Sequence, residues 1–235
     1  MTLSFGVLIP STNTTAEIEY RQLPTSYQPH FARLLTSTPG RPFAPSRDED
    51  IDYQSRLLGT AKVRMVVLIQ TSASLFADDY DAVTIRRMSA GAGVPAITSA
   101  RAVGRALRAL GVRRVGLVSP YSEDVNAKAR RYFGEQHGVE IAAVEGFAAS
   151  DSYTIGKLGP ENARDAFVRI DRPELDAFVV PGGNFATMAS IDAWERELGK
   201  PVVTTNQACV WAVARELGGE RVSGAGRLLD RLPAG

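Results

Sequence analysis

The 235-residue chain is 44% hydrophobic and 23% charged, a composition typical of a soluble globular protein with a sizeable core. Its 27 Lys and Arg residues nearly balance its 26 Asp and Glu residues, which argues against binding to nucleic acid or to a membrane surface. The single cysteine, Cys209, excludes an internal disulfide. A lone thiol and the lack of a signal-peptide pattern in residues 1–10 predict a cytoplasmic location. The longest apolar run, 65–69, is far too short to span a bilayer.

Short β-branched runs alternate with helical patterns along the whole chain. We expect strands near 4–10, 31–37, 64–71, 94–98, 113–119, 139–146, 175–181 and 201–205. We expect helices near 13–23, 48–60, 79–92, 100–110, 123–137, 160–171, 187–199 and 207–217. Continuous apolar runs such as 66–69 and 177–180 are typical of parallel strands that are covered on both faces. The pattern therefore predicts an α/β fold built on doubly wound parallel sheets.

Two pairs of segments are similar to each other and indicate an internal duplication. Residues 6–11 resemble 116–121 in character, and residues 67–72 resemble 178–183. We therefore expect two pseudosymmetric halves: residues 1–112, completed by the C-terminal segment 213–235, and residues 113–212. Two such halves would bring the ends of their strands together, with a ligand in the cleft between them.

The stretch that follows the first predicted strand offers two interpretations. The strand stops at Pro10, and short polar side chains from Ser11 to Thr15 precede a helical pattern. Backbone N–H groups and side chains such as Asn13 would bind a small carboxylate there without a lysine. Alternatively, Asn13 or Thr14 simply caps the helix, with Glu17 as its capping-box partner. These residues alone do not separate the two interpretations.

Three further loops follow predicted strands and carry polar groups. Thr71 and Ser72 offer hydroxyls after the strand at 64–71, and Tyr121 follows the strand at 113–119. Tyr121 either donates a hydrogen bond to a ligand or covers the core. After the strand at 175–181, the sequence Gly182-Gly183-Asn184 either lets the backbone approach a ligand closely or forms only a tight turn.

Other common chemistries find no support in the sequence. No G-x-G-x-x-G, Walker A or G-x-S-x-G motif is present, which disfavours dinucleotides, triphosphates and serine hydrolysis. The two histidines, His30 and His137, form no metal-spaced pair, so we expect no metal site. His137 precedes Gly138 at a predicted helix end, which favours a role in helix termination.

The polar stretch also resembles a known family. Residues 10–15, followed by Glu17 and Glu19, resemble the P-S-S-N-T-T-x-E-x-E signature of maleate cis-trans isomerases, which are grouped with arylmalonate decarboxylases in the aspartate/glutamate racemase superfamily. Residues 70–74 and 181–183 fall at the family's two catalytic loops, and 111–126, 199–206 and 224–229 are also similar. The resemblance implies carboxylate binding by Asn13, a hydrogen bond from Tyr121, catalysis without a cofactor, and a homodimer or homotetramer.

The chain departs from this family where the chemistry takes place. The resemblance implies two catalytic cysteines, one in each half, and decarboxylases keep only the second. The corresponding positions here are Gln70 and Pro181, and neither side chain can act as an acid, a base or a nucleophile in that way. Tyr121 and Cys209 are the remaining weak catalytic candidates. Apolar neighbours favour a buried structural role for Cys209.

Three functions remain open after this departure. The first is a divergent isomerase or lyase that acts on a small carboxylate or dicarboxylate without paired cysteines. The second is a catalytically silent protein that binds or senses a carboxylate, which the missing thiols favour. The third is a maleate cis-trans isomerase proper, against which Gln70 and Pro181 argue. In each case the sequence places the ligand among a common set of polar residues: Ser11, Asn13, Gln70, Thr71, Ser72, Tyr121, Gly182, Gly183 and Asn184.

Overall fold

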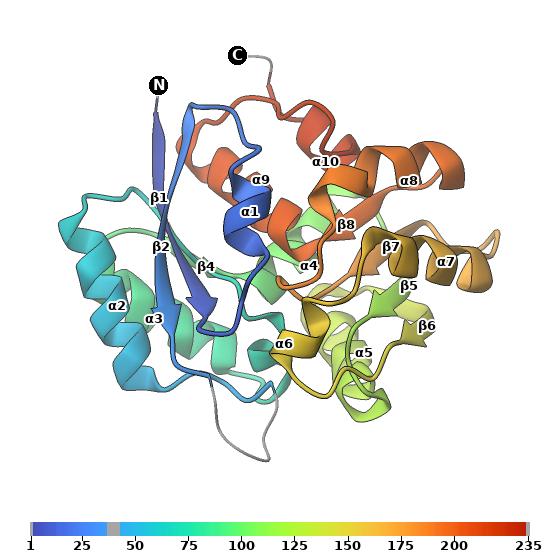
Figure 1. Cartoon of the computed structure of the whole chain (residues 1–235), viewed down its shortest axis with the longest axis horizontal. Coiled ribbons are helices and arrows are strands. Elements are labelled where there is room, and N and C mark those ends of the chain that lie inside the picture. The colour runs from blue at the N-terminus through green and yellow to red at the C-terminus, as the bar shows by residue number, and fades with distance from the viewer. Residues whose placement is uncertain (1, 37–42, 234–235) are drawn as a thin grey trace.

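Two four-stranded parallel sheets form the framework of the molecule (Figure 1). A computed structural model describes residues 2–36 and 43–233. The first sheet has the order β2-β1-β3-β4 and the second the order β6-β5-β7-β8, so the two sheets share one topology. Their strands are β1 (Leu3–Pro10), β2 (Tyr27–Leu34), β3 (Val66–Leu68), β4 (Ala96–Thr98), β5 (Arg114–Ser119), β6 (Glu140–Gly146), β7 (Ala177–Val180) and β8 (Val202–Thr204).

Helices cover both sheets, as expected for a doubly wound α/β fold. The first half contains α1 (Ala16–Tyr20), α2 (Asp48–Thr60), the 3₁₀ turn η1 (Thr71–Leu75), α3 (Tyr80–Ala92) and α4 (Ser99–Leu110). The rest of the chain contains α5 (Glu123–His137), α6 (Ser152–Ile155), α7 (Pro160–Ile170), the 3₁₀ turn η2 (Met188–Ser190), α8 (Ile191–Leu198), α9 (Thr205–Leu217) and α10 (Arg227–Asp230). The sequence predicts every one of these except the short elements η1, α6 and α10; the helix expected at 187–199 covers both η2 and α8.

One hydrophobic cluster extends through both halves, and a second cluster lies between the first sheet and helices α2 and α3. The strands β3 and β7 are buried along their full length, which is why they appear in the sequence as unbroken apolar runs. Helices α4 and α9 pack against each other in the middle of the molecule, between the two sheets (Figure 1). Each of these helices begins directly after the last strand of its own sheet. The joint between the halves is therefore built from equivalent helices.

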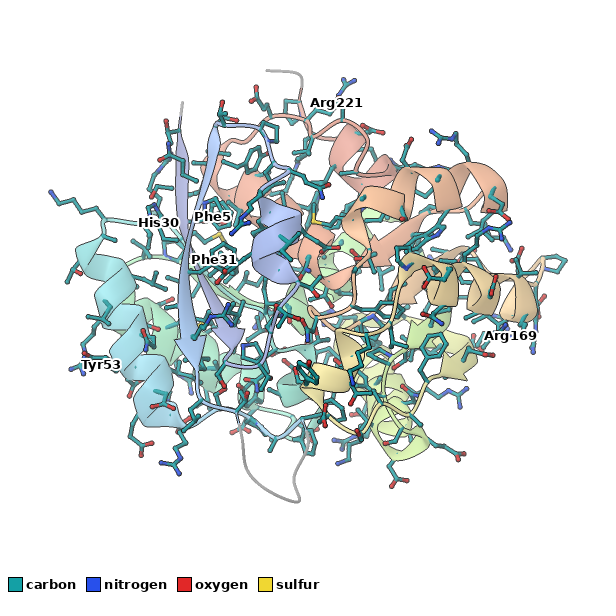
Figure 2. All side chains as sticks on the ribbon, in the orientation of Figure 1. Phe5, His30, Phe31, Tyr53, Arg169 and Arg221 are labelled. Atoms are coloured by element: carbon teal, nitrogen blue, oxygen red, sulfur yellow. The ribbon has the colours of Figure 1, made fainter. Side chains whose placement is uncertain are left out.

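Helix α1 is anchored by an aromatic cluster on the first sheet. Figure 2 labels Phe5 of β1 and Phe31 of β2, which lie next to α1 in this view. The Tyr20 ring of α1 lies 6.2 Å from the Phe5 ring and 5.9 Å from the Phe31 ring, measured between centroids. Its hydroxyl donates a hydrogen bond of 3.0 Å to the Asn206 carbonyl in the second half. Thus a five-residue helix is held by packing rather than by its own length.

Most predicted bounds differ from those of the structure by a few residues, and two of the differences have an evident physical reason. The strand expected at 31–37 begins earlier, at Tyr27, because β2 pairs with β1 from Leu3↔Tyr27 to Pro10↔Leu34; residue 37 lies outside the described residues. The helix expected at 13–23 spans only Ala16–Tyr20. It cannot start earlier because the Asn13 side chain accepts hydrogen bonds from the first free N–H groups.

The C-terminal segment contacts the first half. Glu220 accepts hydrogen bonds from the Ser26 hydroxyl, at 2.7 Å, and through its carbonyl from the Tyr27 hydroxyl, at 2.5 Å. The boundary near residue 112, between α4 and β5, remains a prediction. Within residues 2–36 and 43–233, every helix is too short or too polar to cross a membrane.

Candidate functional site

The loops after the strands of both sheets surround one cavity of about 540 Å³. Its position agrees with the general rule that open α/β sheets bind ligands beyond the carboxyl ends of their strands. The lining residues from the first half are Pro10, Thr12, Asn13, Thr36, Phe43, Ala44, Ile69, Gln70, Thr71 and Ser72; those from the second half are Tyr121, Ser150, Asp151, Ser152, Tyr153, Ile155, Gly182, Gly183 and Asn184. The cavity thus brings together eight of the nine binding residues chosen from sequence, all except Ser11.

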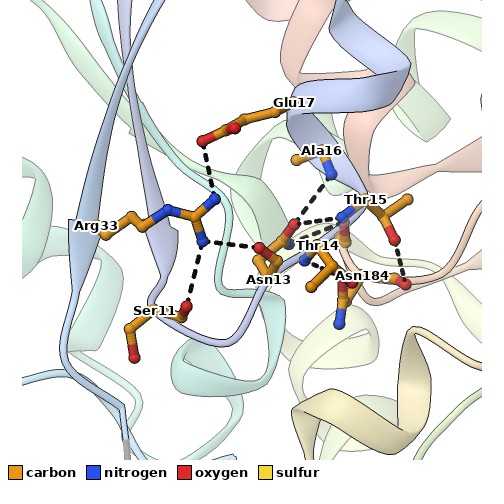
Figure 3. Close-up of polar contacts among 9 residues, drawn as sticks. Ser11, Asn13, Thr14, Thr15, Ala16, Glu17, Arg33 and Asn184 are labelled. Carbon is orange, nitrogen blue, oxygen red and sulfur yellow. Dashed lines mark hydrogen bonds and ion pairs between the residues drawn. The ribbon is translucent and has the colours of Figure 1, made fainter.

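Asn13 lines the cavity, and its side chain binds the backbone at the start of α1 (Figure 3). Its Oδ1 atom accepts hydrogen bonds from the N–H groups of Thr15, at 3.0 Å, and Ala16, at 2.9 Å. Its Nδ2 atom donates to the Gly183 carbonyl of the other half, at 3.0 Å. Thr15 is the N-cap residue of α1, so the expectation that Asn13 or Thr14 is the N-cap is wrong. The Asn13 oxygen binds the N–H groups at the start of the helix from outside it, and only the second N–H bond of its amide is left for a ligand.

Glu17 is not a capping-box partner, contrary to one of the sequence interpretations. Its carboxylate pairs with Arg33 of β2, with 2.9 Å between Oε1 and Nη2 (Figure 3). The other Arg33 nitrogen donates to the carbonyls of Ser11 and Asn13. The Ser11 hydroxyl lies 3.5 Å from Thr36 Oγ1, outside the cavity lining. Arg33 therefore fixes the path of the chain that carries Asn13.

Asn184 joins the first loop to the second half. Its Oδ1 accepts a hydrogen bond of 2.8 Å from the Thr14 N–H, and its carbonyl accepts one of 2.9 Å from the Thr15 hydroxyl. Its Nδ2 donates to the Ser152 carbonyl of α6, at 2.7 Å. Asn184 therefore positions three segments around the cavity at once.

The positions of Gly182 and Gly183 favour glycine, and the loop that they form also has unpaired backbone N–H groups. Gly182 has φ +100°, a conformation that favours glycine. A Cβ atom at Gly183 would lie 2.0 Å from Ile69 Cγ2, so no larger residue fits there. The N–H of Gly182 donates to Thr205 Oγ1 at 2.9 Å. Among the described residues, the N–H groups of Gly183 and Asn184 have no hydrogen-bond partner, which leaves them free for an anion.

The Gly183 carbonyl connects the cavity to a buried carboxylate. It accepts hydrogen bonds from the side chains of Asn13 and, at 3.1 Å, Asn206. Asn206 Nδ2 also donates to Glu19 Oε2 of α1, at 2.6 Å, and Glu19 Oε1 accepts from the N–H groups of Thr187 and Met188. Burial raises the pKa of the Glu19 carboxyl, and these three hydrogen bonds oppose that rise. This chain of contacts crosses between the halves directly behind the cavity.

Thr71 has a structural role in the joint between the halves. Its hydroxyl lies 3.0 Å from Ser99 Oγ and 3.0 Å from Thr205 Oγ1, which are the first residues of α4 and α9. All three side chains are buried. The hydroxyl therefore ties the end of β3 to the two central helices, and its capacity to bind a ligand is limited.

Gln70 and Ser72 bind a segment of the first half. Gln70 Oε1 accepts from the N–H of Ser46, at 3.3 Å, and from its hydroxyl, at 3.0 Å. Gln70 Nε2 donates to the Ala44 carbonyl at 3.1 Å, and Ser72 Oγ donates to the Phe43 carbonyl at 3.1 Å. At the position where the family resemblance implies a thiol, the chain therefore has an amide whose oxygen and nitrogen are both engaged.

Tyr121 covers the cavity as a protonated phenol. It is buried, and its ring makes an edge contact with the Phe43 ring at 5.3 Å between centroids. Burial raises the pKa of the phenol well above its usual range, although the hydroxyl and N–H of Ser72 partly oppose this. Tyr121 can therefore donate a hydrogen bond at neutral pH but cannot act as a base.

The other catalytic candidates lie outside the cavity lining. Cys209 is 1% exposed within the core, and burial raises the pKa of its thiol, so it is not a poised nucleophile. Pro181 is also buried and does not line the cavity. Asp151 is the only carboxylate among the described lining residues. Hydrogen bonds from the backbone and hydroxyl of Thr154 lower its pKa.

The described lining includes no thiol, imidazole, ammonium or guanidinium group. In the same part of the chain, no three His, Cys, Asp or Glu side chains lie close enough together to hold a metal ion.

Sequence reasoning missed about half of the lining residues. The polar ones are Thr12, Thr36 and residues 150–153, and the apolar ones include Phe43, Ala44, Ile69 and Ile155. Thr12 belongs to a loop that the sequence had singled out, and its buried hydroxyl oxygen has no partner among the described residues. Ile69 directly follows β3. The others follow β2 and β6, whose downstream loops carry no recognisable motif.

Comparisons with known proteins agree with this architecture. Residues 47–229 match the model of the arylmalonate decarboxylase family. The chain is 31% identical over 192 residues to the arylmalonate decarboxylase of Bordetella bronchiseptica, covering 77% of this chain and 78% of that protein. It is 26% identical over 251 residues to the maleate isomerase of Alcaligenes faecalis, covering 97% of each.

Solved structures show the same fold. The maleate isomerase of Pseudomonas putida S16 superposes with a TM-score of 0.87 at 24% identity, over 99% of this chain and all of that one. A crystal structure of arylmalonate decarboxylase superposes with a TM-score of 0.81 at 26% identity, over 96% of this chain and 98% of that one. The chain therefore belongs to the arylmalonate decarboxylase family, in the branch that also contains the maleate isomerases.

Proposed function

We propose that the cavity binds a small carboxylate and that the protein acts on it as a lyase of the decarboxylase type, without thiol chemistry. One observation carries the proposal: neutral donors from both halves face a cavity whose described lining has no thiol. These donors are the N–H groups of Gly183 and Asn184, the free N–H of the Asn13 side-chain amide and the Tyr121 phenol.

Neutral donors suit a carboxylate in a partly enclosed site. Backbone N–H and hydroxyl groups form charge-assisted hydrogen bonds with an anion, and these are about twice as strong as neutral ones. The described lining contains no Lys or Arg that would compete for the anion or favour a phosphate. The ligand would thus be recognised by the number and the direction of its hydrogen bonds rather than by a positively charged side chain.

Within the isomerase and lyase chemistry of the family, bond cleavage by decarboxylation is the step that needs no thiol. In a malonate, the bond between the α carbon and one carboxylate breaks, CO₂ leaves, and the electron pair moves into the other carboxylate to give an enediolate. Donors around that oxygen stabilise the developing charge. The enediolate then takes a proton from water, which leaves hydroxide. Isomerisation by addition of a thiolate to an alkene, in contrast, requires a nucleophile that the described lining lacks.

A catalytically silent carboxylate-binding protein is the second candidate. It is favoured by the same set of lining residues, because none of those described is an acid that readily delivers a proton at neutral pH. A maleate isomerase proper is disfavoured by Gln70 and Pro181. Independence from a cofactor, assembly as a homodimer or homotetramer, and a cytoplasmic location also belong to the proposal.

The test combines turnover with binding. The purified chain is incubated in D₂O with methyl-, phenyl- and methyl-phenyl-malonate, CO₂ release is followed, and ligand-induced shifts of the melting temperature are recorded. The lyase proposal predicts CO₂ release, a deuteron on the α carbon and, because water delivers the proton, a racemic product from the disubstituted acid. Thermal shifts without CO₂ would favour the silent binder. If neither is seen, both candidates are rejected.

Two hydroxyl deletions locate the site. Tyr121→Phe should weaken malonate binding about 10-fold or more, since a hydrogen bond to a charged group contributes ~1.5–3 kcal/mol. The matched control is Tyr27→Phe, which removes a hydroxyl that binds the Glu220 carbonyl, outside the cavity. Equal affinities for the two variants would remove Tyr121 from the binding site.

A further inference from the structure

The segment 43–46 forms one apolar side of the cavity and is held there by few contacts. Phe43 and Ala44 line the cavity, and Ser46 is buried just before the start of α2. Four hydrogen bonds connect the segment to the rest of the described chain, and all of them end on the side chains of Gln70 and Ser72. The position of this wall therefore depends on the loop after β3.

Gln70 supplies three of these four hydrogen bonds. Its side chain is 7% exposed, so the amide would be left without partners if the segment moved away. An unpaired buried amide is unfavourable, because both its N–H donors and its carbonyl acceptor lose their hydrogen-bond partners. The Gln70 amide and the segment are thus fixed together.

Phe43 is in a conformation that needs such support. Its φ is +69°, which is rare for a bulky residue and is kept only where surrounding contacts enforce it. The hydrogen bond from Ser72 to its carbonyl and the edge contact of its ring with Tyr121 supply that support. Phe43 consequently lies beside one of the donors proposed to bind the carboxylate.

We propose that Gln70 is a positioning residue: its amide holds segment 43–46 as the apolar wall of the cavity, and this wall sets the size of the apolar group that a ligand can carry. The part about ligand size rests on the proposed function, since it concerns the substituent of a bound carboxylate. The position of the wall itself does not depend on it.

The test uses Gln70→Met, which keeps the length and volume of the side chain and removes both polar ends. Gln207→Met is the matched control. Gln207 is also a buried amide, accepting from the Thr204 N–H at 3.2 Å and donating to the Ala225 carbonyl at 2.7 Å, outside the cavity. Both variants lose comparable hydrogen bonds, but only one of them touches the wall.

Hydrogen exchange measures directly whether segment 43–46 stays in place. In Gln70→Met the amide of Ser46, which donates to Gln70 Oε1 in the native chain, should exchange at least tenfold faster, and in Gln207→Met it should not change. Unchanged exchange in Gln70→Met, or an equal increase in both variants, would overturn the proposal.

Binding affinities for ligands of different size test the consequence for specificity. Affinities are measured for methyl-, phenyl- and naphthyl-malonate and for two neutral probes, benzyl alcohol and naphthalenemethanol. The ratio of phenyl to naphthyl affinity should fall at least fivefold in Gln70→Met and stay constant in Gln207→Met. An unchanged ratio overturns the role of Gln70 in ligand size. If the neutral probes bind as well as the malonates, the proposed carboxylate function fails, while the size ratio of the neutral pair still tests Gln70.

Discussion

Asp81 is a buried carboxylate of α3 whose removal should destabilise the fold strongly. Its Oδ1 accepts hydrogen bonds from Ser74 Oγ, at 2.6 Å, and Thr98 Oγ1, at 2.7 Å, and its Oδ2 accepts one from the Tyr132 hydroxyl. Each hydrogen bond to a charged acceptor contributes ~1.5–3 kcal/mol. Two effects reduce the total loss. The three hydroxyls can bind other partners in the variant, and the folded chain no longer has to desolvate a buried charge. We therefore predict that Asp81→Ala lowers the free energy of unfolding by about 3–5 kcal/mol, below the sum of three such bonds.

Urea unfolding at pH 7, followed by the fluorescence of the buried Trp194 and Trp211, measures this loss. The melting temperature should fall by about 6–20 °C, since ~1 kcal/mol corresponds to ~2–4 °C in a chain of this size. Asp81→Asn keeps the shape and one acceptor, so about 1–3 kcal/mol is expected. Asp165→Ala, at an exposed carboxylate, should stay within about 0.5 kcal/mol. A loss below about 1 kcal/mol in Asp81→Ala would refute the reasoning.

Two further predictions concern titration and reactivity. Burial, together with Arg108, lowers the pKa of His137 to about 4, so the unfolded chain takes up a proton between pH 6.5 and 4 that the folded chain does not. The free energy of unfolding should therefore decrease as the pH falls through this window. His137→Gln should reduce this decrease by about 1–2 kcal/mol, a figure that allows for solvent screening of the partly exposed ring. Urea unfolding at pH 7 and at pH 4.5 measures both effects. Cys209 should react with a disulfide reagent at pH 8 at least about 100-fold more slowly in the native chain than in urea, because its thiol is buried and its pKa raised; similar rates would show that the thiol is accessible.

Most of the fold could be predicted from the sequence because both strands and helices leave clear periodic signals. Helices α2 and α5 occupy the predicted ranges, and β3 and β7 lie within uniformly apolar runs. The start of β2 could not be placed, since it is an edge strand whose bounds depend on pairing with β1. The four-residue helix α6 is too short to show any periodicity.

The site was predictable where one loop follows one strand and not where distant loops meet. Asn13, Tyr121 and Gly183 follow strands directly, so topology alone brings them together. Their hydrogen bonds were not predictable: the carbonyl that accepts from Asn13 lies 170 positions away in the sequence. The contribution of Phe43 depends on a positive φ and on contacts with Ser72, neither of which a local pattern reveals.

The contacts behind the cavity also determine how a ligand can enter and leave. Asn13 and Asn206 share the Gly183 carbonyl, Glu19 holds the backbone at 187–188, and Asn184 binds the first loop. A hinge opening of the two halves would break the hydrogen bonds of Asn13, Glu19 and Asn184 together, because each of them joins one half to the other. The donors are thus ordered before any ligand arrives, so binding requires little loss of conformational entropy at this face. We therefore expect ligand exchange to proceed past a part of the lining that lies outside these contacts, such as segment 43–46.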